Sequence, residues 1–223
     1  MTPHPVPGPR LADLRRSYAA GGLAEGDLAA GWPEQFERWF AEVMAAGVTE
    51  PNAVVLATAS PSSGPSARTV LLKAVDERGF VVYTNLRSRK GTEALAGGRA
   101  GLCFSWVDLE RQVCVVGTVE QVTVAEADAY FASRPRGSQL GAWSSDQSAV
   151  VASREVLEAR RSAYASRFEG ADVPRPPHWS GLRVVPETVE FWQGREDRLH
   201  DRLRFRREDA GGAAGWVVER LEP

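Results

Sequence analysis

A short run near the C-terminus, from Glu190 to Arg202, concentrates side chains that bind anions and flat rings. It contains Trp192, His200 and three arginines. If its last five residues are extended, alternate side chains share a face, so Arg198, His200 and Arg202 project together. Such a face suits an anionic ligand with a polar ring. A charged, solvated edge strand is the alternative interpretation of the same pattern.

Further basic residues recur at the ends of expected strands. Arg68 and Lys73 flank an apolar run, and Ser88, Arg89 and Lys90 begin an expected helix. Cations beside hydroxyls and beside the free N–H groups of a first helical turn bind phosphate. Each pair taken alone also fits a solvated surface. Arg68 and Lys73 are an odd number of positions apart, so a flat strand would place their side chains on opposite faces. Either a bulge intervenes or they serve different ligands.

The elements that must position these residues are mostly short strands. Apolar runs alternate with turns rich in Gly, Pro and Asp, which favours antiparallel hairpins over βαβ units. Strands are expected at 53–59, 68–75, 80–85, 100–106, 112–122, 182–185, 188–193, 201–206 and 216–221. Helices are expected at 11–20, 33–47, 88–96, 123–133 and 153–168. Together these strands and helices predict a mainly β protein, with one β-barrel domain and helical decoration.

The composition of the chain limits the classes of protein to which it can belong. The chain has 223 residues, 43% of them hydrophobic, enough to bury a core as one domain or as two small ones. The pattern of strands favours one domain, over 11–223. Residues 1–10 are proline-rich without an apolar signal core, so we expect a disordered tail. The 27 Lys and Arg balance 29 Asp and Glu, which argues against a nucleic-acid partner. The chain has two cysteines and no apolar run long enough for a membrane span, so we expect a cytoplasmic protein.

Several kinds of site are missing from the sequence. There is no GxGxxG or Walker A loop, no Gly-x-Ser-x-Gly elbow, and no His/Cys cluster with zinc spacing. We therefore expect neither a bound metal nor hydrolytic chemistry.

Five blocks together resemble the pyridoxine/pyridoxamine 5′-phosphate oxidase family and follow one another in the family order. They are the residues 68–73 (RTVLLK), 83–90 (YTNLRSRK), 109–112 (LERQ), 130–143 (YFASRPRGSQLGAW) and 190–202 (EFWQGREDRLHDR). The resemblance implies an FMN-binding split β-barrel of antiparallel strands and a homodimer with FMN at the subunit interface. It also implies oxidation of pyridoxamine or pyridoxine 5′-phosphate to pyridoxal 5′-phosphate. O2 would be consumed and H2O2 released, with ammonia from the amine substrate.

The same resemblance assigns residues to each ligand. The implied FMN contacts are Arg68, Thr69, Val70, Leu71, Leu72, Lys73, Tyr83, Thr84, Arg89, Lys90, Gln112, Gln147, Ser148, Trp192 and Arg202. The implied substrate contacts are Arg15, Tyr18, Lys73, Tyr130, Arg134, Ser138, Arg198 and His200. Arg198 and His200 form the implied catalytic pair, which would steer the reacting carbon toward the flavin. The flanking arginines disfavour a protonated His200, so we expect a neutral ring.

Two rival functions use the same barrel. One is another flavin oxidoreductase, such as a phenazine-pathway oxidase or a deazaflavin-dependent reductase, which would keep the flavin half of the site and change the substrate half. The other is a non-catalytic protein that binds flavin or haem, which would not need two phosphate sites. The block from Arg198 to Arg202, with Tyr130, Arg134 and Ser138, argues against both.

Overall fold

The computed structural model describes residues 14, 17–19, 21–210 and 213–223. The strands are β1 (Ala53–Ser60), β2 (Gly64–Asp76), β3 (Gly79–Asn85), β4 (Arg99–Trp106), β5 (Arg111–Gln121), β6 (Trp179–Gln193), β7 (Asp201–Ala210) and β8 (Ala213–Arg220). The helices are α1 (Trp32–Ala45), α2 (Arg89–Gly97), α3 (Val124–Ser133), α4 (Arg136–Ser144) and α5 (Arg154–Arg167), with short 3-10 helices η2 (Glu25–Asp27), η3 (Val107–Leu109) and η4 (Glu196–Arg198).

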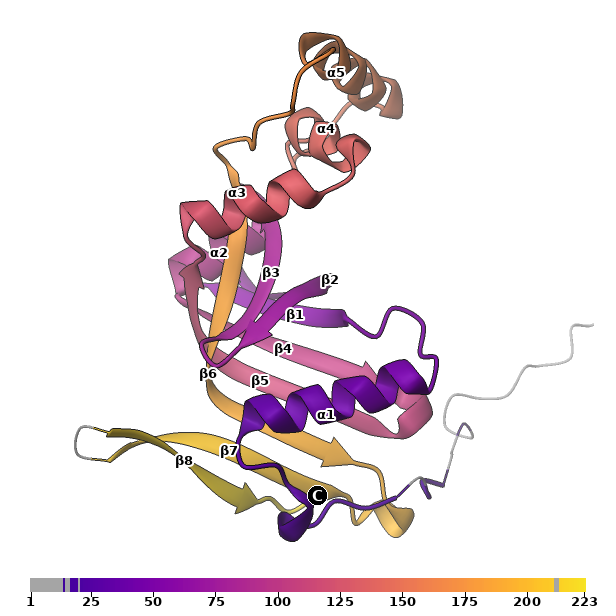
Figure 1. The fold of residues 1–223 in the computed structure, drawn as a ribbon, viewed down its shortest axis with the longest axis vertical. Helices are drawn as coiled ribbons and strands as arrows, with labels where there is room; N and C mark the ends of the chain where they lie inside the picture. The colour runs from indigo at the N-terminus through magenta and orange to yellow at the C-terminus, as the bar shows by residue number, and fades with distance from the viewer. Residues whose placement is uncertain (1–13, 15–16, 20, 211–212) are drawn as a thin grey trace, which may run out of the picture.

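One antiparallel sheet contains all these strands, in the order β3-β2-β1-β4-β5-β6-β7-β8. Strand β3 also pairs with β6, from Phe80 opposite Val184 to Asn85 opposite Trp179. This extra pairing closes the first six strands into a barrel, and β7 and β8 continue from it as a two-stranded ribbon (Figure 1). The predicted fold class, a β-barrel with helical decoration, is confirmed.

Aromatic side chains from α1 and the barrel strands form the centre of the core. The Phe36 ring lies 5.1 Å from Phe80 and 5.1 Å from Phe104, and Trp32 lies 5.0 Å from Phe80. All four side chains are buried. Burying such a side chain contributes about 1.5–3 kcal/mol, so this cluster fixes α1 against the barrel.

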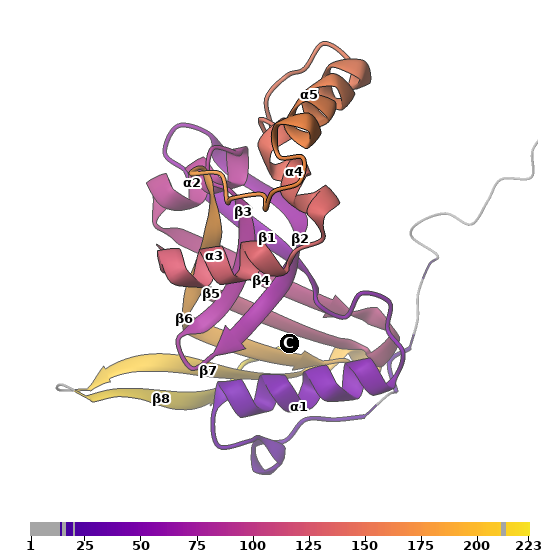
Figure 2. The ribbon, with the colours of Figure 1, turned by 45° about the horizontal axis from the view of Figure 1, so that its top comes forward.

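The remaining helices gather at the other end of the molecule. Helices α3, α4 and α5 lie together beyond β3, away from α1 and the ribbon (Figure 2). Within the described ranges, no helix is both long and apolar enough to cross a membrane.

Local signals placed three helix starts correctly. Thr123 and Glu126 form the reciprocal capping box of α3, and the Ser88 side chain accepts a hydrogen bond from the N–H of Gly91 at the start of α2. Pro33 occupies the first turn of α1.

The prediction of two strands at 182–185 and 188–193 was wrong, because β6 is continuous. Val116 pairs with Thr188 and Gly117 with Pro186, so Glu187 is the extra residue of a bulge. A proline is tolerated in a strand at such a position because its missing N–H leaves no ladder bond unmade.

Helix α4 was missed, since Pro135, Gly137 and Gly141 weaken its helical pattern. The helix expected at 11–20 is not present in its described members, Leu14 and residues 17–19. The rest of that stretch, with Arg15 and the expected tail at 1–10, lies outside the described residues.

The condition under which Arg198, His200 and Arg202 would share a face, an extended run from Arg198 to Arg202, is not met. Strand β6 ends at Gln193, and β7 begins only at Asp201. Between them the chain turns, and Asp197 and Arg198 have positive φ angles of 54° and 64°. Arg198 therefore does not share a strand face with Arg202.

The close approach of β5 to β6 at the bulge predicts that replacing Gly117 by alanine destabilises the fold. A Cβ added at Gly117 would overlap the carbonyl oxygen of Val185. We expect Gly117→Ala to lower the free energy of unfolding by about 1–3 kcal/mol, measured by denaturant titration. Gly215→Ala in β8 is the matched control, since its Cβ would meet nothing within 4 Å. Equal stability of the two variants would contradict the prediction.

Candidate functional site

Strands β2 and β3 and helices α3 and α4 surround a cavity of about 490 Å³, called the barrel cavity below. Eleven of its lining residues are among those predicted for the two ligands: Thr69, Val70, Leu71, Lys73, Tyr83, Thr84, Lys90, Tyr130, Arg134, Ser138 and Gln147. The fold thus brings together residues from three separate sequence blocks, and Gln147 from the loop after α4.

One wall of the barrel cavity is aromatic. The rings of Tyr83 and Tyr130 stack at 4.0 Å with 20° between their planes, and Tyr83 and Trp179 stack at 5.3 Å and 11°. Burial raises the pKa of both tyrosine hydroxyls, so they remain protonated donors at neutral pH. Trp179 was not predicted, because nothing in the local sequence distinguishes it from tryptophans of the core.

Arg134 brings a partly buried cation to this wall. Its Cζ lies 4.7 Å from the centre of the Trp179 ring. Its Nη1 is buried and has no hydrogen-bond partner in the described part of the chain, and burial lowers its pKa. A donor left in this state is the group that an anionic ligand would satisfy. Ser138, in the first turn of α4, lines the same cavity.

The start of α2 carries a second basic group. The ammonium of Lys90 donates to Thr84 Oγ1 at 3.2 Å and to Gln147 Oε1 at 2.7 Å, and burial lowers the pKa of Lys90. The backbone N–H of Arg89 donates to Ser148 Oγ at 3.1 Å. Hydroxyls, an ammonium and helix N–H groups converge here, which is the donor set that phosphates bind.

The β2 residues divide between two faces. Leu72 belongs to the core, and Arg68 donates inward to Leu56 O at 3.1 Å, so neither lines the barrel cavity. The pairing register shifts between Leu72 and Ala74, which makes Lys73 the extra residue of a bulge, and Lys73 lines the cavity. The bulge is therefore present, but Arg68 and Lys73 still lie on different faces.

Three other predicted residues form a row across β5, β6 and β7, called the C-terminal row below. Gln112 of β5 pairs with Trp192 of β6, which pairs with Arg202 of β7. Arg202 holds Glu190 through two hydrogen bonds of 2.7 and 3.1 Å. This ion pair fixes the guanidinium beside Trp192.

Rings gather beside the C-terminal row. His200 lies 4.6 Å from Trp192, and Tyr18 lies 5.7 Å from His200. The backbone N–H of Arg195 donates to His200 Nδ1 at 3.1 Å. Accepting this bond requires a lone pair on Nδ1. Arg198, in the turn of η4, is exposed.

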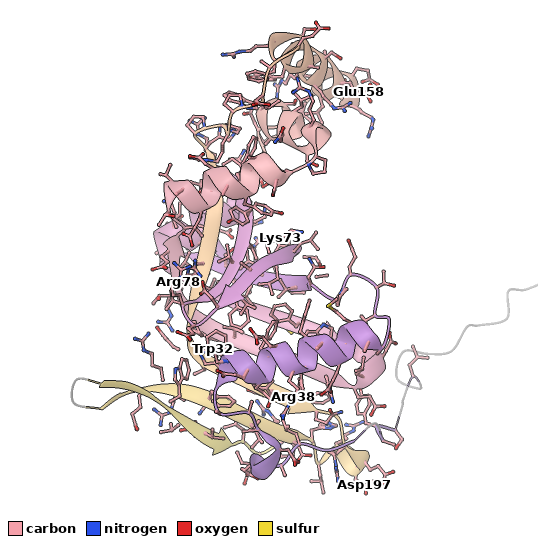
Figure 3. The ribbon with its side chains drawn as sticks, viewed as in Figure 1. Trp32, Arg38, Lys73, Arg78, Glu158 and Asp197 are labelled. Atoms are coloured by element: carbon pink, nitrogen blue, oxygen red, sulfur yellow. The ribbon has the colours of Figure 1, made fainter. Side chains whose placement is uncertain are left out.

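The barrel cavity and the C-terminal row lie apart within one chain. Figure 3 shows Lys73 beside β2 and Asp197 of η4 at the far end, beyond α1. The cavity that includes Tyr18 is lined by Arg195 and Leu199 but by no residue of the barrel cavity. The candidate site thus consists of two separate parts.

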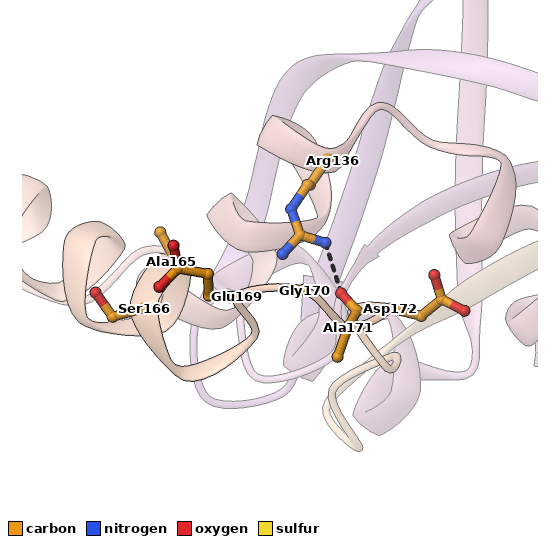
Figure 4. A pocket seen from close by; sticks show the side chains of 7 residues that line it. All are labelled: Arg136, Ala165, Ser166, Glu169, Gly170, Ala171 and Asp172. Atoms are coloured by element: carbon orange, nitrogen blue, oxygen red, sulfur yellow. Dashed lines mark hydrogen bonds between the residues drawn. The ribbon is translucent and has the colours of Figure 1, made fainter.

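A larger cavity, of about 880 Å³, lies between α4 and the end of α5 (Figure 4). None of its lining residues was predicted for a ligand. Its cation, Arg136, already donates to Ala171 O at 2.8 Å and to Phe168 O at 2.5 Å. Among the described residues that line it, none has a buried donor without a partner, as Arg134 has in the barrel cavity.

The closed antiparallel barrel with its C-terminal ribbon defines a split-barrel protein. A family model described as pyridoxamine 5′-phosphate oxidase matches residues 40–168, and one described as the pyridoxine 5′-phosphate oxidase C-terminal dimerisation region matches residues 179–223. The chain belongs to the pyridoxamine 5′-phosphate oxidase family.

Similar proteins agree with this assignment. A pyridoxine/pyridoxamine 5′-phosphate oxidase of Frankia alni is 57% identical over 219 residues, covering 97% of this chain and 90% of that protein. One of Rubrobacter xylanophilus is 57% identical, covering 96% of each chain. The crystal structure of PhzG from Burkholderia lata 383 in complex with tetrahydrophenazine-1-carboxylic acid has a TM-score of 0.82. It is 31% identical and covers 89% of this chain and 95% of that one.

The buried donor of Arg134 that has no partner predicts that the ligand-free protein becomes more stable when Arg134 is replaced. Arg134→Met removes a buried donor without a partner, so we expect the free energy of unfolding to rise by about 1 kcal/mol without ligand, measured by denaturant titration. Arg136→Met, which breaks two satisfied hydrogen bonds, should lower it. A destabilised Arg134→Met protein would show that Arg134 serves the fold instead.

Proposed function

We propose that the protein is an FMN-dependent oxidase that converts pyridoxamine 5′-phosphate and pyridoxine 5′-phosphate to pyridoxal 5′-phosphate. O2 is the acceptor and H2O2 a product, with ammonia released from the amine. One observation carries the proposal: the barrel cavity is lined by two separate cations, Arg134 and Lys90 at the start of α2, beside a stack of aromatic rings. Two relatives that are 57% identical to this chain are named pyridoxine/pyridoxamine 5′-phosphate oxidase, which supports the proposal.

The two phosphates are assigned by the chemistry of the donors. The FMN phosphate binds at the start of α2, through Lys90, Arg89 and Ser148, with Arg68 behind them. The substrate phosphate binds Arg134, whose Nη1 lacks a partner among the described residues, together with Tyr130 and Ser138. Lys73 lines the cavity between the two sets and reaches both ligands. This separation orients the substrate ring relative to the flavin.

The flavin fits the residues present, since the donor set at α2 suits its phosphate, and when bound it supplies the redox chemistry. Thr69, Val70 and Leu71, which line the barrel cavity, would hold its ring, with Tyr83, Thr84 and Gln147 beside it. The protein binds both ligands, keeps water from the reacting carbon and holds protons at defined atoms. His200, whose Nδ1 accepts a backbone N–H, keeps its proton on Nε2 for donation to the substrate.

We propose that the site is completed between two subunits of a homodimer. The C-terminal region matches a family model described as a dimerisation region, which supports the dimer. Because the C-terminal row lies away from the barrel cavity of its own chain, the partner subunit supplies its row, Gln112, Trp192 and Arg202, to each cavity. Arg198 and His200 of the partner subunit come with it. Tyr18, which packs on His200, covers the substrate from the same side.

Two further proposals concern the chain as a whole. We propose a single domain over residues 11–223, because β6 belongs to the barrel and also pairs with β7 of the ribbon. We also propose a cytoplasmic protein, since Cys103 and Cys114 face each other on paired strands and are free thiols, as in a reducing compartment.

A phenazine-pathway oxidase is the second candidate, favoured by the likeness to PhzG. The donors for a substrate phosphate distinguish the two, because tetrahydrophenazine-1-carboxylic acid carries a carboxylate and no phosphate. Arg134, Tyr130 and Ser138 together favour the phosphorylated substrate.

The direct test uses the purified protein. We expect flavin absorbance after reconstitution with FMN, and formation of pyridoxal 5′-phosphate and peroxide when pyridoxine 5′-phosphate is added in air. A protein that FMN cannot reconstitute would overturn the proposal. Turnover of a reduced phenazine carboxylate, with none of pyridoxine 5′-phosphate, would favour the second candidate.

Arg198 is exposed in its turn, so its replacement leaves the fold intact. We expect Arg198→Leu to lower kcat on pyridoxine 5′-phosphate by on the order of a hundredfold while FMN stays bound, because the substrate ring loses a positioning contact. Stopped-flow absorbance separates the two effects. Unchanged turnover would remove Arg198 from the site.

Sharing of the site predicts complementation between inactive variants. Arg134→Met and Arg198→Leu affect different parts of the site, so a mixed dimer has one intact site and one doubly altered site. Random mixing of co-expressed chains makes half of the dimers mixed, which restores about a quarter of wild-type activity for a two-fold symmetric pair. A mixture no more active than its parents would place both parts in one chain.

A further inference from the structure

Glu93 of α2 is a buried carboxylate that belongs to none of the blocks identified in the sequence. Its side chain is 3% exposed. It accepts hydrogen bonds from Thr58 Oγ1 at 2.7 Å and Ser63 Oγ at 2.9 Å, and also from Ser66. These bonds, Ser66 first, hold the pKa of Glu93 well below its ordinary value, so the carboxylate stays ionised.

Two arginines also reach this carboxylate. Arg89 Nε donates to Glu93 Oε1 at 2.8 Å, and Arg68 Nη2 lies 3.4 Å from Oε2. The Arg89 side chain is 56% exposed, and within the described residues its two Nη atoms donate no hydrogen bond. Glu93 thus binds one edge of the Arg89 guanidinium and leaves the other edge available.

The cations around Glu93 repel one another. The pKa of Lys90 is lowered by burial and, next, by the charge of Arg68, and Arg89 precedes Lys90 in the chain. Like charges this close favour conformations in which the exposed side chain moves away. A buried, ionised carboxylate between two of the cations offsets that repulsion and fixes their geometry before any ligand arrives.

We propose that Glu93 is a positioning residue for phosphate recognition: it holds Arg68 and Arg89 at the start of α2 so that their remaining N–H groups, with Lys90, receive the phosphate of the flavin. The inference rests on the proposed function, in which these cations bind FMN. Glu93 does not contact the ligand and acts only through the arginines.

The test compares FMN with riboflavin, which has the same ring system and no phosphate. The full-length protein is stripped of flavin, and the Kd of each ligand is measured by quenching of flavin fluorescence. We expect Glu93→Gln to weaken FMN by on the order of tenfold, a change of about 1.4 kcal/mol, and to leave riboflavin unchanged. The amide keeps the size of the side chain and removes its charge.

Asp76→Asn is the matched control. Asp76 is also a carboxylate held by two arginines, Arg78 at 2.7 Å and Arg183 at 2.8 Å, but at the β2–β3 turn. Its replacement should change neither Kd. If Glu93→Gln does not fold, Ser66→Ala takes its place, because Ser66 hydrogen-bonds both Glu93 and Arg68. A smaller loss, again confined to FMN, is then expected.

A double-mutant cycle tests the route through Arg89. Glu93→Gln should weaken FMN less in an Arg89→Met background than in the wild type, because one of the two arginines it positions is gone. Equal weakening of FMN and riboflavin, or FMN binding that is unchanged or tighter in Glu93→Gln, would overturn the inference. Failure of the wild-type protein to bind any flavin would instead overturn the proposed function.

Discussion

The pairing of β3 with β6 is the constraint on which the rest of the structure depends. It closes the barrel, and it places Trp179, at the start of β6, beside Tyr83 of β3 in the wall of the barrel cavity. The far end of the same strand carries Trp192 and pairs with β7. A strand of 15 residues extends up to about 50 Å. One continuous strand therefore forms both parts of the candidate site and also keeps them apart.

The arginines of the site differ in what already holds them. Arg202 is bound by Glu190 and Arg68 by its barrel neighbours, so their positions are set by the protein itself. Arg134 has a buried nitrogen without a partner in the described chain, and Arg198 is exposed in a turn. Since an unpaired buried donor costs stability, Arg134 is the clearest sign of a ligand. Residue type alone does not separate these two groups.

Much of the fold was predictable where a local signal and the tertiary structure agree. The caps at Ser88 and Thr123 and the proline at the start of α1 marked helices that the core then stabilises. Predictions failed where tertiary pairing overrides local preference. In the sequence Pro186 indicates the end of a strand. In the structure a bulge beside Gly117 allows β6 to continue past Pro186.

The candidate site was predictable as a set of residues but not as an arrangement. An extended run from Arg198 to Arg202 would have given one basic face, whereas positive φ angles at Asp197 and Arg198 turn the chain between β6 and β7. Trp192 and Arg202 still become neighbours, because antiparallel pairing places them opposite each other. The turn places Arg198 and His200 outside strands β6 and β7, so pairing between strands does not fix their main chain. Side chains in such a position are free to serve a ligand bound outside their own barrel, which is the role proposed for Arg198 and His200.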